Sequence, residues 1–432
     1  MYNEDSNHKD FLKAPFRGFG GIKEAIILAG GLGTRLRDTV PDLPKCMAPV
    51  AGRPFLFYVI NYLRSQGIEK FIFSLGYRHE VIEAYLNDQF STLNYECTVE
   101  EEPLGTGGAI QLACTKTTEE NVLITNGDTI FKIHIDELAT VHYKNTADAT
   151  LGLKPMTDFD RYGIVEINEK NAITSFQEKQ FCKQGNINGG VYLLNVKALL
   201  NTKWPGKFAF EKDFLETQKF RLFGSVQDKY FIDIGIPEDY CKAQAEFAKP
   251  VLNLKAIDKS WTIFIDRDGV INHEKKEDYI KNWDEFRFYE GIKEAFQVLN
   301  KKFGKIVVVS NQRGVGRELM TETDLHNIHQ YMTKEIVTAG GRIDKIYYCT
   351  STDNKHPNRK PNPGMAFLAK ADYPGIDLNK SIMIGNKLSD MRFGRNAGIY
   401  TIFVATTNPD TAFPHIDIDN RFGSLPDFVK AL

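Results

Sequence analysis

Short apolar runs alternate with longer amphipathic stretches along the chain, and each run ends at glycine or a polar residue. AIILA (25–29), KFIFSLG (70–76) and NVLITNGD (121–128) are typical of buried strands, and FLFYVINYLRSQG (55–67) is typical of a connecting helix. This alternation predicts an α/β fold with a parallel sheet covered by helices on both faces. The later runs ATLGLKPM, GIVEINE, AITSFQEK and GGVYLLN are joined by shorter turns, so we expect a mixed sheet edge there.

The pattern restarts after residue 250, which predicts a second domain. PEDYCKAQAEFAKP is typical of a helix that ends at a proline, and the next eight residues carry little pattern. WTIFIDRDG, GKIVVVSNQRG and KSIMIGNKLSD then predict new strands. A chain of 432 residues also favours two or three domains. We therefore expect two Rossmann-like α/β domains, with these boundaries: a flexible N-terminal arm over 1–22, a first domain over 23–250, a linker over 251–258 and a second domain over 259–432.

Composition narrows the class of protein. The formal net charge is −2, which argues against nucleic acid as the main partner because no basic field is present. The six cysteines lie far apart and form no CxxC pair, which is typical of a reducing cytoplasm and predicts neither a disulfide framework nor an evident zinc site. The first residues lack the apolar segment of a signal peptide, and no apolar run approaches the roughly 18 residues of a membrane span. We expect a cytoplasmic protein with no membrane partner.

A glycine-rich segment, LAGGLGTRL (28–36), follows the first predicted strand. Glycines leave backbone N–H groups open to a ligand, and such groups at the end of a parallel strand hold phosphate oxygens. The spacing does not fit the dinucleotide-binding fingerprint, because Leu36 stands where glycine is needed, and the GK[ST] of a P-loop is absent. A tight strand-to-helix turn is the alternative interpretation. Three cationic residues lie at the end of this segment and just after it: Arg35, Arg37 and Lys45. Cations held there would neutralise the charge of a leaving pyrophosphate. A solvated basic loop is the alternative interpretation.

Six blocks together carry a family resemblance over about 23–248. AIILAGGLGTRL…LPKCMAPVAGRPFL, EEPLGTGGAI, TNGD, FQEK, INGG and FIDIGIPEDY resemble, in this order, the sugar-1-phosphate nucleotidyltransferases. DFDRYG, INGGVYLL and FIDIGIPEDY are most similar to the heptose 1-phosphate guanylyltransferases, with the mannose and glucose enzymes as close relatives. The resemblance implies that an anionic sugar 1-phosphate oxygen attacks the α-phosphorus of GTP and that pyrophosphate leaves, without a general base.

The resemblance also implies roles for individual residues. The nucleotide-binding residues would be Gly30, Gly31, Gly33, Thr34, Glu102, Gly105, Thr106 and Gly107. The catalytic cations would be Arg35 and Lys45. The sugar and its phosphate would be bound by Glu178, Lys179, Asn188 and Gly189. Two carboxylates at strand ends, Asp128 and Asp233, would hold Mg²⁺, a hard cation that bridges phosphates.

The second half carries a pair of aspartates directly after a strand, in FIDRDGVIN. Residues two apart on a continuing strand share a face, so we expect Asp266 and Asp268 to point together. One would attack phosphorus and the other would protonate the leaving alcohol. An acidic turn is the alternative interpretation. Ser310 ends another strand, and Lys360 and Asp390 follow later, which completes the pattern of a phosphatase.

This second pattern resembles the haloacid dehalogenase-like phosphatases. SNQRGVGR, RKPNPGM and MIGNKLSDM are most similar to the heptose 1,7-bisphosphate 7-phosphatases, over about 259–405. The resemblance implies Asp266 as nucleophile and Asp268 as acid and base. It implies that the substrate and its phosphate are bound by Ser310, Asn311, Arg359 and Lys360. Mg²⁺ would be bound by Asp266, the carbonyl of Asp268, Asn386 and Asp390.

The chain departs from that phosphatase family at two places. Gly385–Asn386–Lys387 replaces the usual GDK, which keeps an oxygen ligand but removes a charge. The loop that often holds zinc offers only Cys349 and His356, and two ligands do not close a tetrahedral site, so we predict no zinc. No long insertion separates Asp268 from Ser310, so we predict no cap domain.

Both halves suit one pathway. We interpret the chain as a bifunctional enzyme that makes GDP-heptose for surface glycans. One half would remove the 7-phosphate of heptose 1,7-bisphosphate, and the other would join the resulting heptose 1-phosphate to GMP from GTP. The alternatives are a transferase for mannose or glucose 1-phosphate fused to a histidinol-phosphate-like phosphatase, or a chain with one non-catalytic half. The residues do not determine the nucleobase or the anomer of the sugar phosphate. They also do not determine whether the chain forms a homo-oligomer or whether intermediate passes between the two sites.

Overall fold

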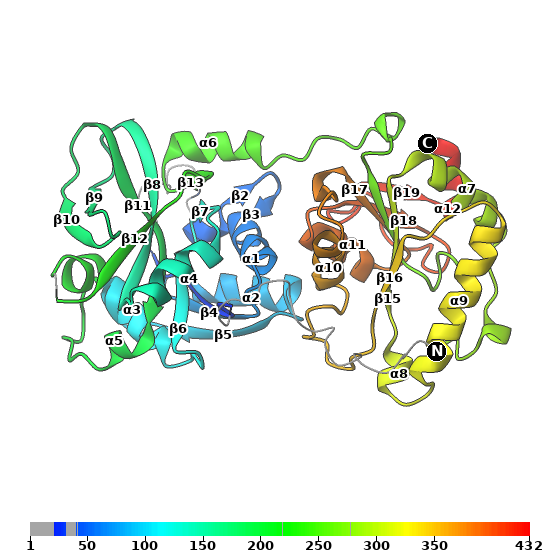
Figure 1. The fold of residues 1–432 in the computed structure, drawn as a ribbon, viewed down its shortest axis with the longest axis horizontal. Helices are drawn as coiled ribbons and strands as arrows, with labels where there is room; N and C mark the ends of the chain where they lie inside the picture. Colours follow the sequence, from blue (N-terminus) through cyan, green and yellow to red (C-terminus); the bar gives the residue numbers. More distant parts are fainter. Residues whose placement is uncertain (1–20, 32–39, 41, 218, 277) are drawn as a thin grey trace, which may run out of the picture. The chain divides into compact units, whose positions relative to one another are not determined.

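The computed structural model describes residues 21–31, 40, 42–217, 219–276 and 278–432, and the chain divides into two units, Met1–Lys249 and Pro250–Leu432 (Figure 1). Most of the predicted N-terminal arm lies outside the described residues. So do three predicted site residues, Gly33, Thr34 and Arg35, and the neighbouring Arg37.

The first unit is built on a nine-stranded mixed sheet. Its parallel part follows the order β6-β1-β4-β5 and consists of β1 (Glu24–Leu28), β4 (Lys70–Leu75), β5 (Asn94–Val99) and β6 (Asn121–Asn126). The mixed part contains β8 (Ala149–Phe159), β9 (Ile164–Ile167), β10 (Ile173–Gln177), β11 (Cys182–Asn195) and β12 (Leu222–Val226). Because β11 runs antiparallel to β6 and to β8, the predicted mixed edge is confirmed.

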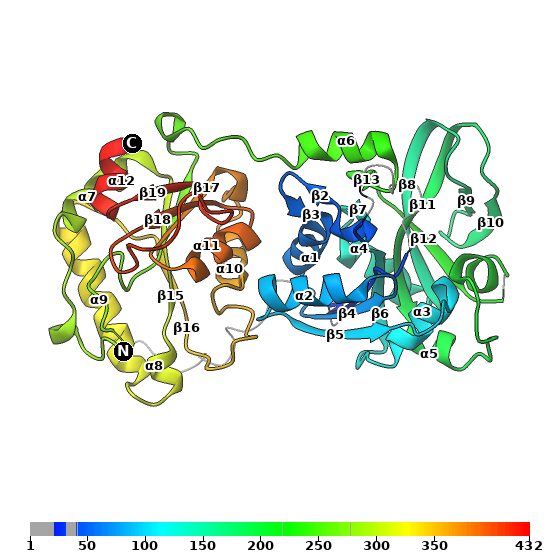
Figure 2. The same ribbon diagram turned by 180° about the vertical axis from the view of Figure 1, so that it is seen from behind.

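Helices cover both faces of this sheet (Figures 1 and 2). One face packs against α1 (Phe55–Ser65), α2 (His79–Gln89), α4 (Ile135–Lys144) and α6 (Pro237–Glu246). The other packs against α3 (Gly105–Cys114), α5 (Val196–Leu200) and a π-helix, η2 (Phe210–Leu215). Side chains alternate along the strands, so Phe71 and Phe73 enter the first core while Ile72 enters the second. The predicted two-sided cover is confirmed.

A small ribbon beside the sheet joins distant parts of the sequence. β7 (Thr129–Phe131) pairs antiparallel with β13 (Phe231–Asp233), and the register places Asp233 opposite Thr129. Near them lie η1 (Lys45–Met47), β2 (Pro49–Val50) and β3 (Arg53–Pro54), with β2 paired to β3. The ribbon thereby brings Asp128, in the turn before β7, close to Asp233, the last residue of β13.

The second unit is built on a fully parallel six-stranded sheet with the order β16-β15-β14-β17-β18-β19. The strands are β14 (Thr262–Ile265), β15 (Lys305–Asn311), β16 (Lys345–Cys349), β17 (Ser381–Gly385), β18 (Tyr400–Val404) and β19 (Asn420–Phe422). The chain runs outward from β14 to one edge and then returns to β17 on its other side. Ligands of such sheets bind at the carboxyl ends of the strands beside this reversal, which here lies between β14 and β17.

Helices also cover both faces of the second sheet. One core contains α7 (Ile292–Lys302), α9 (Glu322–Thr338) and α12 (Leu425–Ala431), and the other contains α10 (Gly364–Asp372) and α11 (Leu388–Asn396). The shorter helices are η3 (Leu254–Ala256), η4 (Trp283–Glu285), α8 (Arg313–Gly316) and η5 (Leu378–Lys380). Between Asp268 and Ser310, residue 277 aside, the chain forms only turns, isolated bridges, η4, α7 and the start of β15, as the predicted capless fold requires.

Part of the predicted linker packs on the second unit. Leu252 and Ile257 are buried in its core, and the Tyr400 hydroxyl donates a hydrogen bond to the Pro250 carbonyl at 3.0 Å. In the described part of the chain, no helix combines the length and the apolar character that a membrane span requires.

Candidate active sites

One charged cluster in the first unit contains three of the predicted residues. Lys45 donates a hydrogen bond from Nζ to Asp128 Oδ2 at 3.2 Å. The Ile234 N–H donates to the Asp128 carbonyl, which holds the loop after β13 against the loop before β7. A Cβ added to Gly235 would lie 2.9 Å from both Asp233 Oδ1 and Lys45 Nζ. The structure therefore brings Lys45, Asp128 and Asp233 to one place.

The charges of this cluster do not balance. Among the residues that the structure describes here, two carboxylates face one ammonium group, which leaves an excess of one negative charge. Burial, and after it the negative charge of Asp128, raises the pKa of Asp233 to about 6. Because two neighbouring carboxylates resist joint ionisation, a cation between them would favour the ionised form of both.

A cavity of about 440 Å³ adjoins the cluster and is lined by the glycine-rich turn after β1. Four of the predicted nucleotide-binding residues line it: Gly30, Gly31, Gly105 and Thr106. Glu102 is exposed and does not line it. Glu100 does, and its Oε2 accepts a hydrogen bond from the Leu104 N–H at 2.8 Å. A Cβ on Gly30 would lie 3.2 Å from Glu100 Oε1 and 3.3 Å from the Gly76 nitrogen, so a side chain there would be tightly packed unless these neighbours moved slightly.

Gly107 is glycine for a packing reason. A Cβ there would lie 2.2 Å from the Phe208 ring, and the Gly107 N–H donates to the Phe208 carbonyl at 3.0 Å. Gly105 has a φ of +73°, and a Cβ there would lie 2.4 Å from the same carbonyl oxygen. Gly107 does not line the cavity, so the structure places it behind the nucleotide wall rather than in it.

A second cavity, of about 650 Å³, contains the predicted sugar-binding residues Glu178, Lys179, Asn188 and Gly189 in its walls. Asn126 and Glu211 line both cavities, while Asp128 lines the first and Asp233 the second. The charged cluster thus lies where the two cavities adjoin.

Three details of these cavities could not be predicted from the motifs. Asn188 uses its amide within the protein, donating to the Tyr192 hydroxyl at 2.9 Å and accepting from the Gly190 N–H at 3.0 Å. Glu211 comes from the π-helix and accepts a hydrogen bond from Thr106 Oγ1 at 2.9 Å. Among the described residues, the buried Tyr162 hydroxyl in the second cavity has no hydrogen-bond partner, and that residue lies in the DFDRYG block. The DFDRYG block was therefore a sequence signal that could have pointed to Tyr162, whereas no evident sequence pattern predicts the π-helix.

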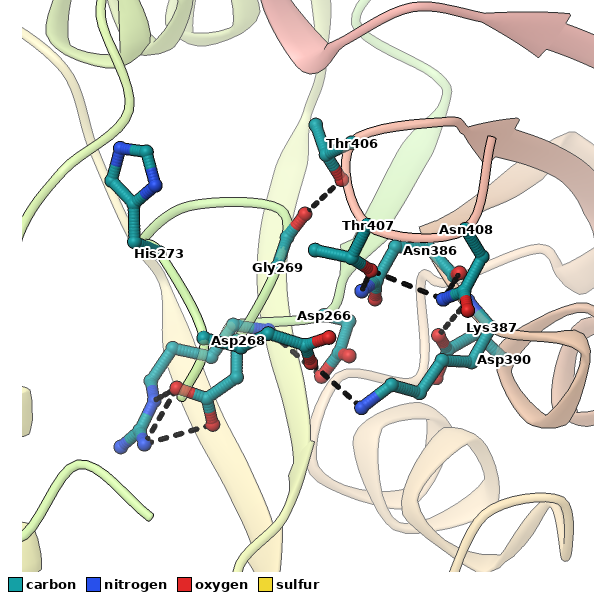
Figure 3. Close-up of polar contacts among 12 residues, drawn as sticks. Asp266, Asp268, Gly269, His273, Asn386, Lys387, Asp390, Thr406, Thr407 and Asn408 are labelled. Carbon is teal, nitrogen blue, oxygen red and sulfur yellow. Dashed lines mark hydrogen bonds and ion pairs between the residues drawn. The ribbon is translucent and has the colours of Figure 1, made fainter. Parts of the chain in front are cut away.

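The second unit has a charged cluster at the ends of β14 and β17 (Figure 3). Lys360 Nζ lies 2.7 Å from Asp266 Oδ1 and 2.7 Å from Asp390 Oδ1, and it donates to the Val309 carbonyl at 3.0 Å. All three charged side chains are buried. Burial raises the pKa of Asp266 although Lys360 opposes this. Two carboxylates again face one ammonium group, so this cluster also favours an added cation.

Ser310 and Asn311 make different contacts in this site. Ser310 Oγ accepts a hydrogen bond from Gln312 Nε2 at 2.7 Å, so its own hydrogen is left to donate. Asn311 instead binds the backbone of Lys360: its Oδ1 accepts from the Lys360 N–H and its Nδ2 donates to the Lys360 carbonyl, both at 3.0 Å. The Asn311 side chain therefore holds the Lys360 backbone in place. Arg359 is partly buried and donates to the Ser351 carbonyl at 3.3 Å.

The prediction that the Asp266 and Asp268 side chains share a face is wrong. The strand ends at Ile265, and the chain then turns through Gly269, whose φ is +85°. Figure 3 shows the Asp268 side chain pointing away from that of Asp266. The Asp268 carboxylate accepts hydrogen bonds from Arg267, Asn272 and Gln312. Burial acts against its ionisation, but Arg267 and these hydrogen bonds outweigh burial and hold the pKa of Asp268 below its usual range.

Asn386 fits a metal site by its unsatisfied oxygen. Its side chain is fully buried, and among the described residues Oδ1 has no hydrogen-bond donor. Its Nδ2 donates to Thr407 Oγ1 at 2.6 Å, and its carbonyl accepts from Asn408 Nδ2 at 2.8 Å (Figure 3). A buried acceptor without a donor costs about 1–3 kcal/mol, and amide oxygens are ligands of hard cations. Asp390 is occupied otherwise, since its Oδ2 accepts from the Lys387 N–H at 3.1 Å.

Neither unit presents a ready metal centre of three side chains. Within the described ranges, no group of three or more His, Cys, Asp or Glu residues is placed to hold a metal ion. Mg²⁺ is usually bound by one or two carboxylates with substrate phosphates and water. Asp128 and Asp233 in the first unit fit that ion, and so does Asp266 with the unsatisfied Asn386 oxygen in the second. Asp390, predicted as a ligand, is instead bound to Lys360 and to the Lys387 N–H. Cys349 Sγ lies 3.5 Å from His356 Nδ1, and the absence of zinc stays a prediction.

Comparison with known proteins follows the division into two units. The nucleotidyl transferase family matches residues 24–249, and the polynucleotide kinase 3 phosphatase family matches residues 262–410. The chain is similar to the D-glycero-alpha-D-manno-heptose 1-phosphate guanylyltransferase of Aneurinibacillus thermoaerophilus, at 50% identity over 225 residues, covering 52% of this chain and 97% of that protein. It is similar to the protein of the same name from Campylobacter jejuni subsp. jejuni serotype O:2, at 44% identity, covering 50% of this chain and 96% of that one.

The chain is also similar to a solved structure over a smaller share of its length. It is the D,D-heptose 1.7-bisphosphate phosphatase from B. bronchiseptica complexed with magnesium and phosphate. The sequence identity is 26%, the match covers 39% of this chain and 96% of that one, and the TM-score is 0.37.

Proposed function

The chain belongs to the nucleotidyl transferase family, and on that premise we propose that it is a bifunctional enzyme of GDP-heptose biosynthesis. The second unit removes the 7-phosphate of D-glycero-D-manno-heptose 1,7-bisphosphate. The first unit joins the resulting heptose 1-phosphate to GMP from GTP and releases pyrophosphate. The observation that carries the proposal is the presence of two separate centres, each with one lysine and two aspartates.

In the first unit, the adjoining cavities suit two substrates that meet at the charged cluster. GTP would occupy the cavity beside the glycine-rich turn, and the sugar 1-phosphate would occupy the cavity with Glu178 and Lys179. Lys45 would contact phosphate oxygens at the junction, and Asp128 and Asp233 would hold Mg²⁺. The ion neutralises charge on the phosphates when bound. The nucleophile is already anionic, so alignment and charge neutralisation are sufficient for catalysis.

The sugar and the base are supported by relatives rather than by a contact in the structure. Both relatives compared above are heptose 1-phosphate guanylyltransferases and are matched over nearly their whole length. Heptose 1-phosphate and GTP are therefore the substrates we propose, since the cavity walls themselves do not distinguish guanine from the other bases.

In the second unit, the geometry suits phosphoryl transfer to an aspartate. Asp266 would attack phosphorus, the bond from phosphorus to the C7 oxygen would break, and Asp268 would give that oxygen a proton. Water would then attack the phosphoaspartate, return a proton to Asp268 and release orthophosphate. Lys360 and Ser310 would contact the phosphoryl oxygens. Asp266, the Asp268 carbonyl and Asn386 would hold Mg²⁺, which neutralises charge on the phosphoryl group when bound.

The substitution Asn386→Asp is expected to tighten Mg²⁺ binding to the phosphatase unit. It adds a negative charge at an oxygen that has no hydrogen donor among the described residues, and the number of ligand charges sets affinity for hard cations. We expect the Mg²⁺ concentration for half-maximal phosphate release to fall at least about tenfold. Titration calorimetry with Mg²⁺ gives a second readout that does not depend on activity.

The matched control for this change is Asn379→Asp, at an exposed position in η5. It adds the same charge outside the site and should leave both Mg²⁺ titrations unchanged. An Asn386→Asp protein with the Mg²⁺ dependence of the unchanged protein would remove Asn386 from the metal site.

The proposed substrates are tested by two panels. Phosphate release is compared for heptose 1,7-bisphosphate, histidinol phosphate and a 3′-phosphorylated oligonucleotide. Pyrophosphate release is compared for heptose, mannose and glucose 1-phosphates with each of GTP, ATP, CTP and UTP. The proposal predicts the highest kcat/KM for the heptose bisphosphate and for the pair of heptose 1-phosphate with GTP. A higher value for mannose 1-phosphate, or for the oligonucleotide, would replace the corresponding half of the proposal.

A further inference from the structure

Gln312 connects two groups of the phosphatase site that act on different parts of a phosphate ester. Its side chain is buried at 1% exposure, and its backbone N–H donates to the Cys349 carbonyl at 2.7 Å. Nε2 donates to Ser310 Oγ at 2.7 Å and to Asp268 Oδ2 at 2.9 Å. A primary amide nitrogen carries two hydrogens, so each of these acceptors can take one.

The first consequence concerns Ser310. A hydroxyl group has one hydrogen to donate and two lone pairs to accept with. Because Gln312 donates to the Ser310 oxygen, the Ser310 hydrogen is directed to another acceptor. A phosphoryl oxygen held by Lys360 would be such an acceptor, since Lys360 Nζ binds the carbonyl of Val309, the residue before Ser310.

The second consequence concerns Asp268. Arg267 donates to both of its oxygens, at 2.9–3.2 Å, and Asn272 donates to Oδ1 at 3.0 Å. Arg267 is itself buried at 1% exposure, and its Nη1 lies 3.2 Å from His329 Nε2 on α9. Of these contacts, the one from Gln312 links the Asp268 carboxylate to the strand that carries Ser310.

We propose that Gln312 is a positioning residue that sets the separation of Ser310 and Asp268, so that both reach one phosphate ester. The Ser310 and Asp268 oxygens lie within two hydrogen-bond lengths of each other through a single nitrogen. When Asp266 attacks phosphorus and the bond to the C7 oxygen breaks, Ser310 binds the phosphoryl group and Asp268 delivers its proton to the leaving oxygen. This inference rests on the proposed phosphatase function.

The test compares two leaving groups in the Gln312→Met protein. The alkoxide that leaves heptose 1,7-bisphosphate needs a proton, whereas p-nitrophenolate leaves p-nitrophenyl phosphate without one. General acid catalysis contributes about 10²–10⁴-fold, so we expect kcat/KM for the heptose ester to fall at least about tenfold further than kcat/KM for the aryl ester. The value of kcat/KM reports the first chemical step, so later hydrolysis of the phosphoaspartate does not mask the difference.

Gln297→Met is the matched control, because Gln297 donates its amide hydrogen to the Ala339 carbonyl outside the site. It should leave both kcat/KM values unchanged. Equal losses on the two esters in Gln312→Met would show a purely structural role and overturn the inference. If Gln312→Met does not fold, Gln312→Leu, which also lacks both donors and adds no charge beside Asp268, is compared in the same way. An unchanged protein that hydrolyses neither ester would instead refute the phosphatase function.

Discussion

Asp266→Asn is expected to abolish phosphate release from heptose 1,7-bisphosphate and to leave nucleotidyl transfer from GTP to heptose 1-phosphate intact. The amide keeps the shape of the side chain but cannot attack phosphorus, so we expect a loss of at least about 1,000-fold in phosphatase kcat. Lys360 keeps its ion pair with Asp390, so the buried lysine still has an anionic partner. Orthophosphate and pyrophosphate are measured separately on the same preparation.

Asp284→Asn is a suitable control for this change, since Asp284 is exposed in η4 and outside both charged clusters. It should preserve both activities. Loss of both activities in Asp266→Asn would show that the two centres do not work independently.

Asp128→Ala is expected to have the opposite effect. It removes one of the two carboxylates proposed to hold Mg²⁺ in the first unit and the hydrogen-bond acceptor of Lys45. Loss of a metal ligand and of a placed lysine should lower pyrophosphate release by at least about 100-fold. Phosphate release by the second unit should stay unchanged. Both rates are followed in the same buffer over a range of Mg²⁺ concentrations.

Asp136→Ala controls for a general effect of removing an aspartate, because Asp136 is exposed in the first turn of α4. Pyrophosphate release at the ordinary rate by Asp128→Ala would remove Asp128 from the metal site.

The strands, their helices and the division into two units could be predicted from the sequence because hydrophobic periodicity records which face of an element is buried. Phe71, Ile72 and Phe73 are an example. Successive side chains of a strand point to opposite faces of the sheet, and Phe71 and Phe73 pack in one core while Ile72 packs in the other. The proximity of Asp128 and Asp233 could not be predicted from hydrophobic periodicity. It depends on the pairing of β7 with β13, two strands of three residues about a hundred positions apart, and only the family resemblance pointed to it.

The details that differ from prediction depend on local backbone geometry and distant packing. Asp266 and Asp268 diverge because β14 ends at Ile265, and a spacing of two says nothing about where a strand stops. Gly107 is required by the ring of Phe208, a hundred residues away. Asn311 serves the backbone of Lys360, in a loop that no local pattern links to it.

If one chain carries two consecutive activities, a single reaction mixture should show both. The protein is incubated with D-glycero-α-D-manno-heptose 1,7-bisphosphate, GTP and Mg²⁺, and ³¹P NMR follows the products. We expect orthophosphate, pyrophosphate and a GDP-sugar, with the GDP-sugar absent when Asp266→Asn replaces the unchanged protein. Orthophosphate without pyrophosphate would contradict the proposed substrates of the first unit, and the absence of both products would contradict the proposed bifunctional enzyme.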